Sequence, residues 1–181
     1  GRDAREIGDG NPGSANAWKL GGWHIGVLAL LLDVLKSVLP VLLFLKVTGL
    51  GNSNSIQYDL GVGIVAISPI IGHAWTPFLK FHGGKALATT MGTWIAVSSG
   101  LALPLLCLFL IPFHLIQKNH AITVTMAFVG MVVFFLIVPE LLMISTISLL
   151  VAITTNFSII VYKHRSEYLD GVLLRNWVQR G

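Results

Sequence analysis

The chain has 181 residues, of which 54% are hydrophobic and 11% are charged, with a net charge of +4 at pH 7. Soluble domains carry about 25% charged residues, so this composition excludes an ordinary globular domain and indicates an integral membrane protein. We therefore expect a lipid bilayer around the chain and no nucleic-acid partner.

Cysteine and histidine usage narrows the chemistry further. The single cysteine, Cys107, lies in an apolar run, so an intrachain disulfide is excluded and a nucleophilic role is not expected. The six histidines lack the H-x-x-x-H and H-E-x-x-H spacings. We expect neither a metal site nor a cofactor.

Six apolar segments are predicted to cross the membrane. A crossing helix needs about 20 residues, and the apolar run over residues 86–117 is too long for one. Ser98-Ser99-Gly100 offers a break within it. The predicted crossings are Trp23–Val47, Leu60–Leu79, residues 86–97, Leu101–Gln117, Ala121–Val138 and Leu141–Tyr162.

The distribution of charges among the loops supports this predicted topology. Alternate loops form two sets, and one set holds ten of the twelve Lys and Arg residues while the other holds none. The ten are Arg2, Arg5, Lys19, Lys80, Lys85, Lys118, Lys163, Arg165, Arg175 and Arg180. The positive-inside rule places them, and both termini, in the cytoplasm. The sequence thus predicts one all-α polytopic membrane domain over residues 1–181.

The first polar segment is a glycine-rich loop that reads GDGNPGSAN over residues 8–16 and precedes Lys19. Its three glycines allow backbone N–H groups to converge on an anion. Asn-Pro-Gly is also common turn chemistry, so a plain surface turn is the alternative.

The second polar segment, KFHGGKALATT over residues 80–90, lies between two apolar runs. Gly83 and Gly84 precede a helix that is expected to begin near Lys85. Free N–H groups and the positive helix end would then face the membrane interface beside a lysine charge. This pattern predicts an anion site, and the alternative is a basic anchor for anionic lipid head groups.

Charged side chains also mark the last span and the first. Lys163-His164-Arg165 is typical of a topology signal, although an imidazole can also bind phosphate and move a proton near neutral pH. Asp33 and Lys36 share one helical face, which permits either a structural ion pair or a functional cavity.

In this order the segments resemble the bacterial PlsY family of membrane glycerol-3-phosphate acyltransferases, which use acyl phosphate as the donor. The family's G-S-G-N-x-G-A-x-N-x-x-R motif is similar to residues 8–19, and its L-L-D-x-x-K stretch to residues 31–36. Its G-H-x-x-x-x-F-x-x-F-x-G-G-K-G-x-A-T motif is similar to residues 72–89. Its H-R-x-N motif is similar to residues 164–167.

The resemblance implies a fold, a reaction and a site. The family has seven helices, and the first would end just before Gly1. The implied reaction moves a fatty acyl group from acyl phosphate to glycerol 3-phosphate at the cytoplasmic side of the bacterial inner membrane. The implied catalytic residues are His164, Lys85 and Asn11. The implied substrate-binding residues are Gly10, Gly13, Ser14, Asn16, Lys19, Lys36, His73, Gly83, Gly84, Thr89 and Arg165.

Four positions depart from the family pattern: Asp9 for Ser, Lys19 for Arg, Ala86 for Gly and Glu167 for Asn. The two carboxylates place negative charge where a dianionic acceptor is expected to bind. A like-charge contact costs about 1 kcal/mol at 4 Å in water and several times that near a protein surface. Two alternatives therefore stand beside the acyltransferase: the same fold with another acceptor or no activity, and a non-enzymatic membrane protein such as a transporter.

Overall fold

The computed structural model describes residues 3–48 and 55–178, and that part of the chain is helical. Six α-helices confirm the predicted all-α class. They are α1 (Ser14–Val47), α2 (Ile56–Ala74), α3 (Leu87–Val97), α4 (Ala102–Ile116), α5 (His120–Ile137) and α6 (Thr146–Lys163). Four segments are long and apolar enough to span a membrane, those of α1, α2, α5 and α6, whereas α3 and α4 are shorter apolar helices.

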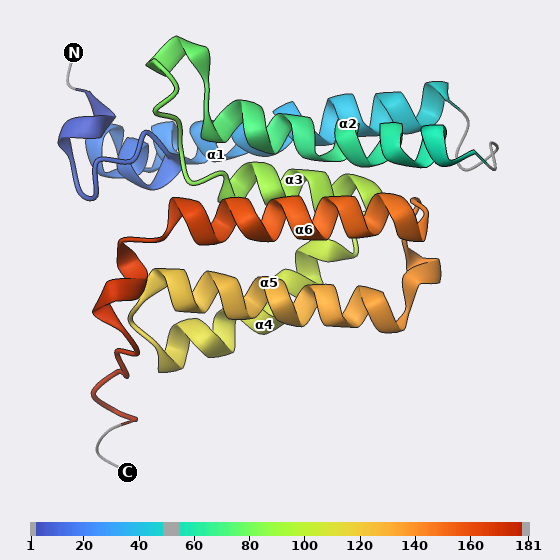
Figure 1. Ribbon diagram of the computed structural model, residues 1–181. Coiled ribbons are helices and arrows are strands. Elements are labelled where there is room, and N and C mark those ends of the chain that lie inside the picture. The colour runs from blue at the N-terminus through green and yellow to red at the C-terminus, as the bar shows by residue number, and fades with distance from the viewer. Residues whose placement is uncertain (1–2, 49–54, 179–181) are drawn as a thin grey trace.

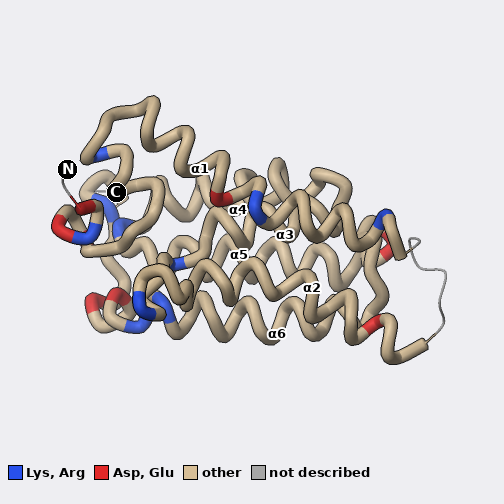
Figure 2. The backbone as a smooth tube through the Cα atoms, turned by 90° about the horizontal axis from the view of Figure 1, so that it is seen from above, with Lys and Arg blue, Asp and Glu red and all other residues tan. Residues whose placement is uncertain are grey.

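Successive helices alternate in direction, so both described ends of the chain lie at the same end of the bundle (Figure 1). The loop between α2 and α3 lies at this end as well, and we call it the terminal end. Figure 2 shows most Lys and Arg residues there. Two of the ten cations counted in the sequence, Arg2 and Arg180, lie outside the described residues.

The predicted break between the third and fourth crossings is confirmed. Ser99 and Gly100 have φ angles of 52° and 93°, which reverse the chain. The Ser98 hydroxyl donates to the Trp94 carbonyl at the end of α3 and accepts from the Ala102 amide at the start of α4. One side chain therefore ends one helix and begins the next.

The first helix begins earlier than the predicted span. It starts at Ser14, and Gly22 interrupts it with a φ of 78° and a ψ of −177°. The apolar span predicted from Trp23 is thus the part of α1 after this kink. The part before the kink carries the polar end of α1 to the terminal end of the bundle.

The core is centred on α3, which contacts α1, α2 and α4. Seven of its eleven residues are buried. Trp94 packs edge-on against Phe128 and stacks on Phe135, both from α5. In contrast, α4 fully buries only Ala102, and five of its long apolar side chains are exposed, as expected where lipid replaces protein contacts: Leu103, Leu108, Ile111, Leu115 and Ile116.

Candidate active site

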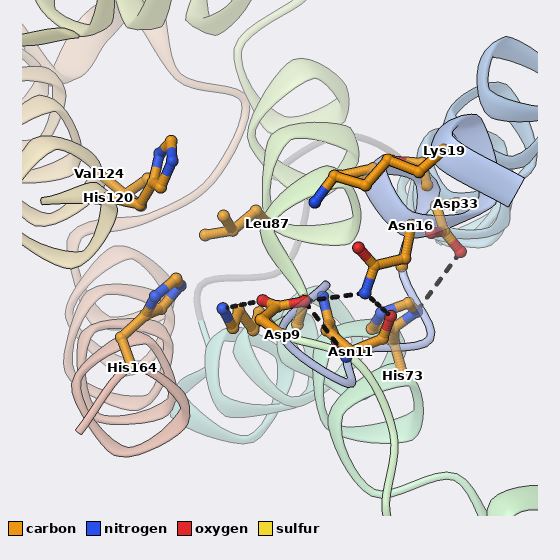
Figure 3. Close-up of a pocket in the computed structure, with 16 residues that line it drawn as sticks. Asp9, Asn11, Asn16, Lys19, Asp33, His73, Leu87, His120, Val124 and His164 are labelled. Atoms are coloured by element: carbon orange, nitrogen blue, oxygen red, sulfur yellow. Dashed lines mark hydrogen bonds and ion pairs between the residues drawn. The ribbon is translucent and has the colours of Figure 1, made fainter. Parts of the chain in front are cut away.

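A central cavity of about 330 Å³ opens at the terminal end of the bundle. The N-terminal loop, the starts of α1, α3 and α5, and the ends of α2 and α6 all contribute to it (Figure 3). It is lined by Asp9, Asn11, Gly13, Ser14, Ala15, Asn16, Lys19, Asp33, His73, Lys85, Ala86, Leu87, Ala88, His120, Val124 and His164.

The glycine-rich loop folds around one buried side chain. The Asn16 Nδ2 group donates to the Ile7 carbonyl at 2.8 Å, the Asn11 carbonyl at 2.9 Å and Asp9 Oδ1 at 2.8 Å. Gly8 and Gly10 take left-handed φ angles of 63° and 72° in this loop. Asn16 therefore holds the loop in the conformation that brings Asp9 and Asn11 to the cavity, and its Nδ2 hydrogens are used within the loop.

Lys85 joins the two carboxylates that depart from the family pattern. Its Nζ lies 2.5 Å from Asp9 Oδ2 and also donates to Glu167 Oε1. These three residues come from the N-terminal loop, the loop before α3 and the segment after α6. The charges at this point are therefore one cation and two anions, and the lysine is already engaged by carboxylates.

The pKa values follow from these contacts. Burial favours the neutral form of both carboxyls, but hydrogen bonds from Lys85 and Asn16 outweigh it and bring the pKa of Asp9 to about 2. Burial likewise opposes the charge on Glu167, yet its bonds with Lys85 and His164 leave its pKa below the usual value. Burial lowers the pKa of Lys85, and the two carboxylates more than reverse this. All three groups are charged at neutral pH.

His164 lies just after α6 with only 1% of its surface exposed, yet it lines the central cavity. Its Nδ1 lies 3.2 Å from Glu167 Oε1. Its Nε2 is buried and has no hydrogen-bond partner among the residues that the structure describes. Burial lowers the pKa of His164, Glu167 raises it in part, and Lys85 and His120 lower it again. The net shift is downward, so the imidazole is neutral at pH 7.

The loop before α3 packs tightly against the end of α2. A Cβ atom at Gly83 would overlap the His73 carbonyl oxygen, and one at Gly84 would overlap the His73 ring. The helix expected near Lys85 begins at Leu87, after Ala86 takes a left-handed φ of 60°. The first residues of α3 line the cavity, where helix N–H groups lack intrahelical acceptors and favour an anion.

Asp33 and Lys36 form the predicted ion pair, with Lys36 Nζ 2.6 Å from Asp33 Oδ1. His73 from α2 joins them: its Nδ1 accepts a hydrogen bond from Lys36 and lies 3.4 Å from Asp33 Oδ1. Asp33 and Lys36 are thus paired with one another and with the histidine that packs on Gly84.

The structure brings thirteen of the fourteen predicted site residues to three neighbouring cavities. Eight line the central cavity: Asn11, Gly13, Ser14, Asn16, Lys19, His73, Lys85 and His164. Lys36 and Gly84 line a second cavity of about 530 Å³, which shares Asp33 and His73 with the first. Gly10, Gly83 and Arg165 line a third of about 640 Å³, which shares Asp9, Asn11 and Lys85.

Thr89 does not line these cavities. It is fully buried in α3, and its hydroxyl has no partner within the described part of the chain. The sequence reading also missed His120, which begins α5 and reaches the central cavity, and the apolar lining residues Leu87 and Val124. The signal available for His120 was its place in a short loop of the predicted cytoplasmic set.

Comparison with known proteins gives one consistent answer. Residues 1–170 match the model of a family described as glycerol-3-phosphate acyltransferase. A glycerol-3-phosphate acyltransferase of Thermotoga maritima is 35% identical over 190 aligned positions, covering 95% of this chain and 87% of that one. One of Staphylococcus carnosus is 31% identical, covering 92% of this chain and 79% of that one.

A solved structure agrees with the sequence relatives. The crystal structure of PlsY (YgiH), an integral membrane glycerol 3-phosphate acyltransferase in its glycerol 3-phosphate form, superposes with a TM-score of 0.78 at 26% identity. The superposition covers 99% of this chain and 86% of that one. Since family model, sequence relatives and fold all extend over nearly the whole chain, it belongs to the glycerol-3-phosphate acyltransferase family.

Proposed function

We propose that this protein transfers a fatty acyl group from acyl phosphate to a hydroxyl of glycerol 3-phosphate, with release of phosphate and lysophosphatidate. The observation that carries this proposal is the central cavity. It combines the Lys85 and Lys19 ammonium groups and the start of α3 with an apolar side made by Leu87, Ala88 and Val124. A small phosphorylated alcohol and a reactive acyl group require both kinds of surface.

The cations and helix start would hold the acceptor's phosphate. Lys19 reaches from α1 into the central cavity (Figure 3), which Lys85 also lines. Ammonium groups and free helix N–H groups both stabilise phosphate oxygens. Asn11 and Ser14 add polar groups for the acceptor's hydroxyls, and the His164 ring lies across the cavity from Lys19 (Figure 3).

The second cavity suits the donor. It places the cationic Lys36 beside Pro69, Phe78 and Leu79, so a phosphate group and the start of an acyl chain have matching surfaces there. Phe78 is 93% exposed, which extends the apolar surface toward the outside of the bundle. The shared residues Asp33 and His73 place this surface directly beside the central cavity.

The transfer is direct in this proposal. An acyl phosphate is already activated, so the protein needs to position the acceptor hydroxyl and to stabilise charge on the departing phosphate. Lys36, which lines the cavity assigned to the donor, would supply the positive charge for that stabilisation. A covalent acyl-enzyme is not required.

The donor assignment is tested by supplying two donors to the purified protein in lipid vesicles. With labelled glycerol 3-phosphate, palmitoyl phosphate is expected to give lysophosphatidate and phosphate in equal amounts, and palmitoyl coenzyme A is expected to give neither. Turnover with the coenzyme A ester alone would contradict the donor. Acylation of a different alcohol alone would contradict the acceptor.

A further inference from the structure

One ring nitrogen of His164 contacts a carboxylate, and the other has no hydrogen-bond partner among the described residues. Its Nδ1 contacts Glu167 at 3.2 Å, while its buried Nε2 has no partner among the described residues. Buried polar atoms in native proteins are rarely left without a partner. Because His164 lines the central cavity, a group bound there is the natural partner for this nitrogen.

The contact with Glu167 determines which ring nitrogen carries the proton. An ionised carboxylate only accepts hydrogen bonds, so a neutral His164 must donate its Nδ1–H to Glu167. Nε2 is then left with a free lone pair, which accepts a proton or a hydrogen bond. The same Glu167 oxygen also accepts from Lys85, so the lysine, the carboxylate and the imidazole form one connected chain.

We propose that Glu167 is a positioning residue that holds His164 in the Nδ1–H form, so that Nε2 accepts the proton of the acceptor hydroxyl. This inference rests on the proposed function and adds a general base to it. At the corresponding place in the H-R-x-N motif the family pattern has asparagine, an uncharged residue whose amide oxygen can also accept a hydrogen bond. The carboxylate beside His164 is therefore a feature of this chain rather than of the motif.

The hydroxyl proton moves to His164 Nε2 while the hydroxyl oxygen bonds to the acyl carbonyl carbon. The bond between that carbon and the phosphate oxygen breaks, and phosphate leaves with the bonding electrons. The proton on Nε2 then passes to the departing phosphate, which returns the imidazole to its neutral form.

The surroundings of His164 set the expected pH dependence. Glu167 lies on its own segment, Lys85 on the loop before α3, and His120 at the start of α5. Burial, Lys85 and His120 lower the pKa of His164, against the effect of Glu167. His164 must be neutral to act as a base. As the pH decreases, kcat is therefore expected to fall only at pH values below the usual pKa of histidine. Removing the charge of Glu167 lowers this pKa further and makes the base weaker.

The test compares kcat between pH 4.5 and 8.5 for the wild-type protein, Glu167→Gln and Asp9→Asn. Both variants remove one carboxylate from Lys85, but only the first removes the charge beside His164. Glu167→Gln is expected to lower the plateau of kcat by about tenfold to a hundredfold and to move its acid limb to lower pH. Asp9→Asn is expected to leave the limb in place. An unchanged limb and plateau in Glu167→Gln would overturn the proposal.

A second measurement does not depend on turnover. Nitrogen NMR of imidazole-labelled wild-type protein, with the His164 signal assigned from a His164→Asn sample, reports which ring nitrogen carries the proton. The Nδ1–H form is expected, and the Nε2–H form would overturn the positioning role. If none of the proteins forms lysophosphatidate, the proposed function fails, and the NMR result still decides whether Glu167 orients the ring.

Discussion

At the scale of single residues, the main feature is the competition for Lys85. The departures at positions 9 and 167 introduce carboxylates near the expected phosphate site, and the structure pairs both of them with this lysine. A dianionic acceptor must therefore compete with the Asp9 and Glu167 carboxylates for the Lys85 ammonium group. The pair that Asp9 forms is the more exposed of the two, since 48% of its side chain is exposed against 23% for Glu167.

Asp9→Asn is expected to lower the KM for glycerol 3-phosphate by about tenfold. It keeps an oxygen for Asn16 but removes a charge that repels the acceptor and occupies Lys85, and one such contact is worth about 1–4 kcal/mol. Steady-state kinetics with acceptor varied at saturating donor measures the effect. Asp170→Asn is the control, because it removes an equal charge at the same end without lining the three cavities. A KM that is unchanged or higher in Asp9→Asn would refute the competition.

Residues of the candidate site were predictable from the sequence where they belong to a recognisable sequence motif. Lys85, His164 and Lys19 share one cavity, as the resemblance implied, although they are far apart in the sequence. The internal use of Asn16 was not predictable, because three hydrogen bonds within a loop leave no spacing signal. His120 was missed for a similar reason: a lone histidine at a helix start belongs to no motif.

At the scale of elements, the loop between α2 and α3 is fixed by close backbone packing and by one lysine. Lys163, at the end of α6, donates to the Ala74 carbonyl at 2.7 Å and to the Gly83 carbonyl at 3.1 Å. Its ammonium also lies 5.4 Å from the centre of the Trp75 ring. The cation predicted as a topology signal therefore also holds the loop that carries Lys85.

Gly83→Ala is expected to destabilise the protein by about 1–3 kcal/mol, because the added methyl group would overlap the backbone carbonyl of His73. Tryptophan fluorescence during thermal unfolding in detergent measures the change as a lower Tm. Gly61→Ala is the matched control: it lies within α2 and a Cβ there meets open space, so its Tm is expected to stay at or slightly above the wild-type value. Equal Tm values for the two variants would contradict the packing argument.

At the scale of the whole molecule, apolar length and loop charge predicted the six helices and their order. Apolar length and loop charge are both properties of long segments, so a single atypical residue does not change the prediction. Helix ends were less predictable: the spans expected from Trp23 and Leu141 begin in the structure at Ser14 and Thr146. The start of α6 is instead set by a local cap, in which the Ser145 hydroxyl accepts from the Ser148 amide.

The predicted orientation places the terminal end in the cytoplasm. In a Cys107→Ala background, a cysteine at Glu140 is expected to react with a membrane-impermeant maleimide in intact bacteria, whereas one at Ser166 is expected to react only after the cells are opened. The reverse result would contradict the cytoplasmic placement of the site. Reaction of both cysteines from the outside would contradict the alternation of the six helices across the membrane.

The most direct test of the central claim is lysophosphatidate formation by Lys85→Ala in vesicles, measured beside the wild-type protein and Lys80→Ala. Lys80 lies in the same loop but does not line the three cavities. We expect turnover by the wild-type protein and by Lys80→Ala, and a loss of about a hundredfold or more in kcat/KM for Lys85→Ala. Full turnover by a folded Lys85→Ala protein would show that binding of the acceptor's phosphate does not depend on this lysine.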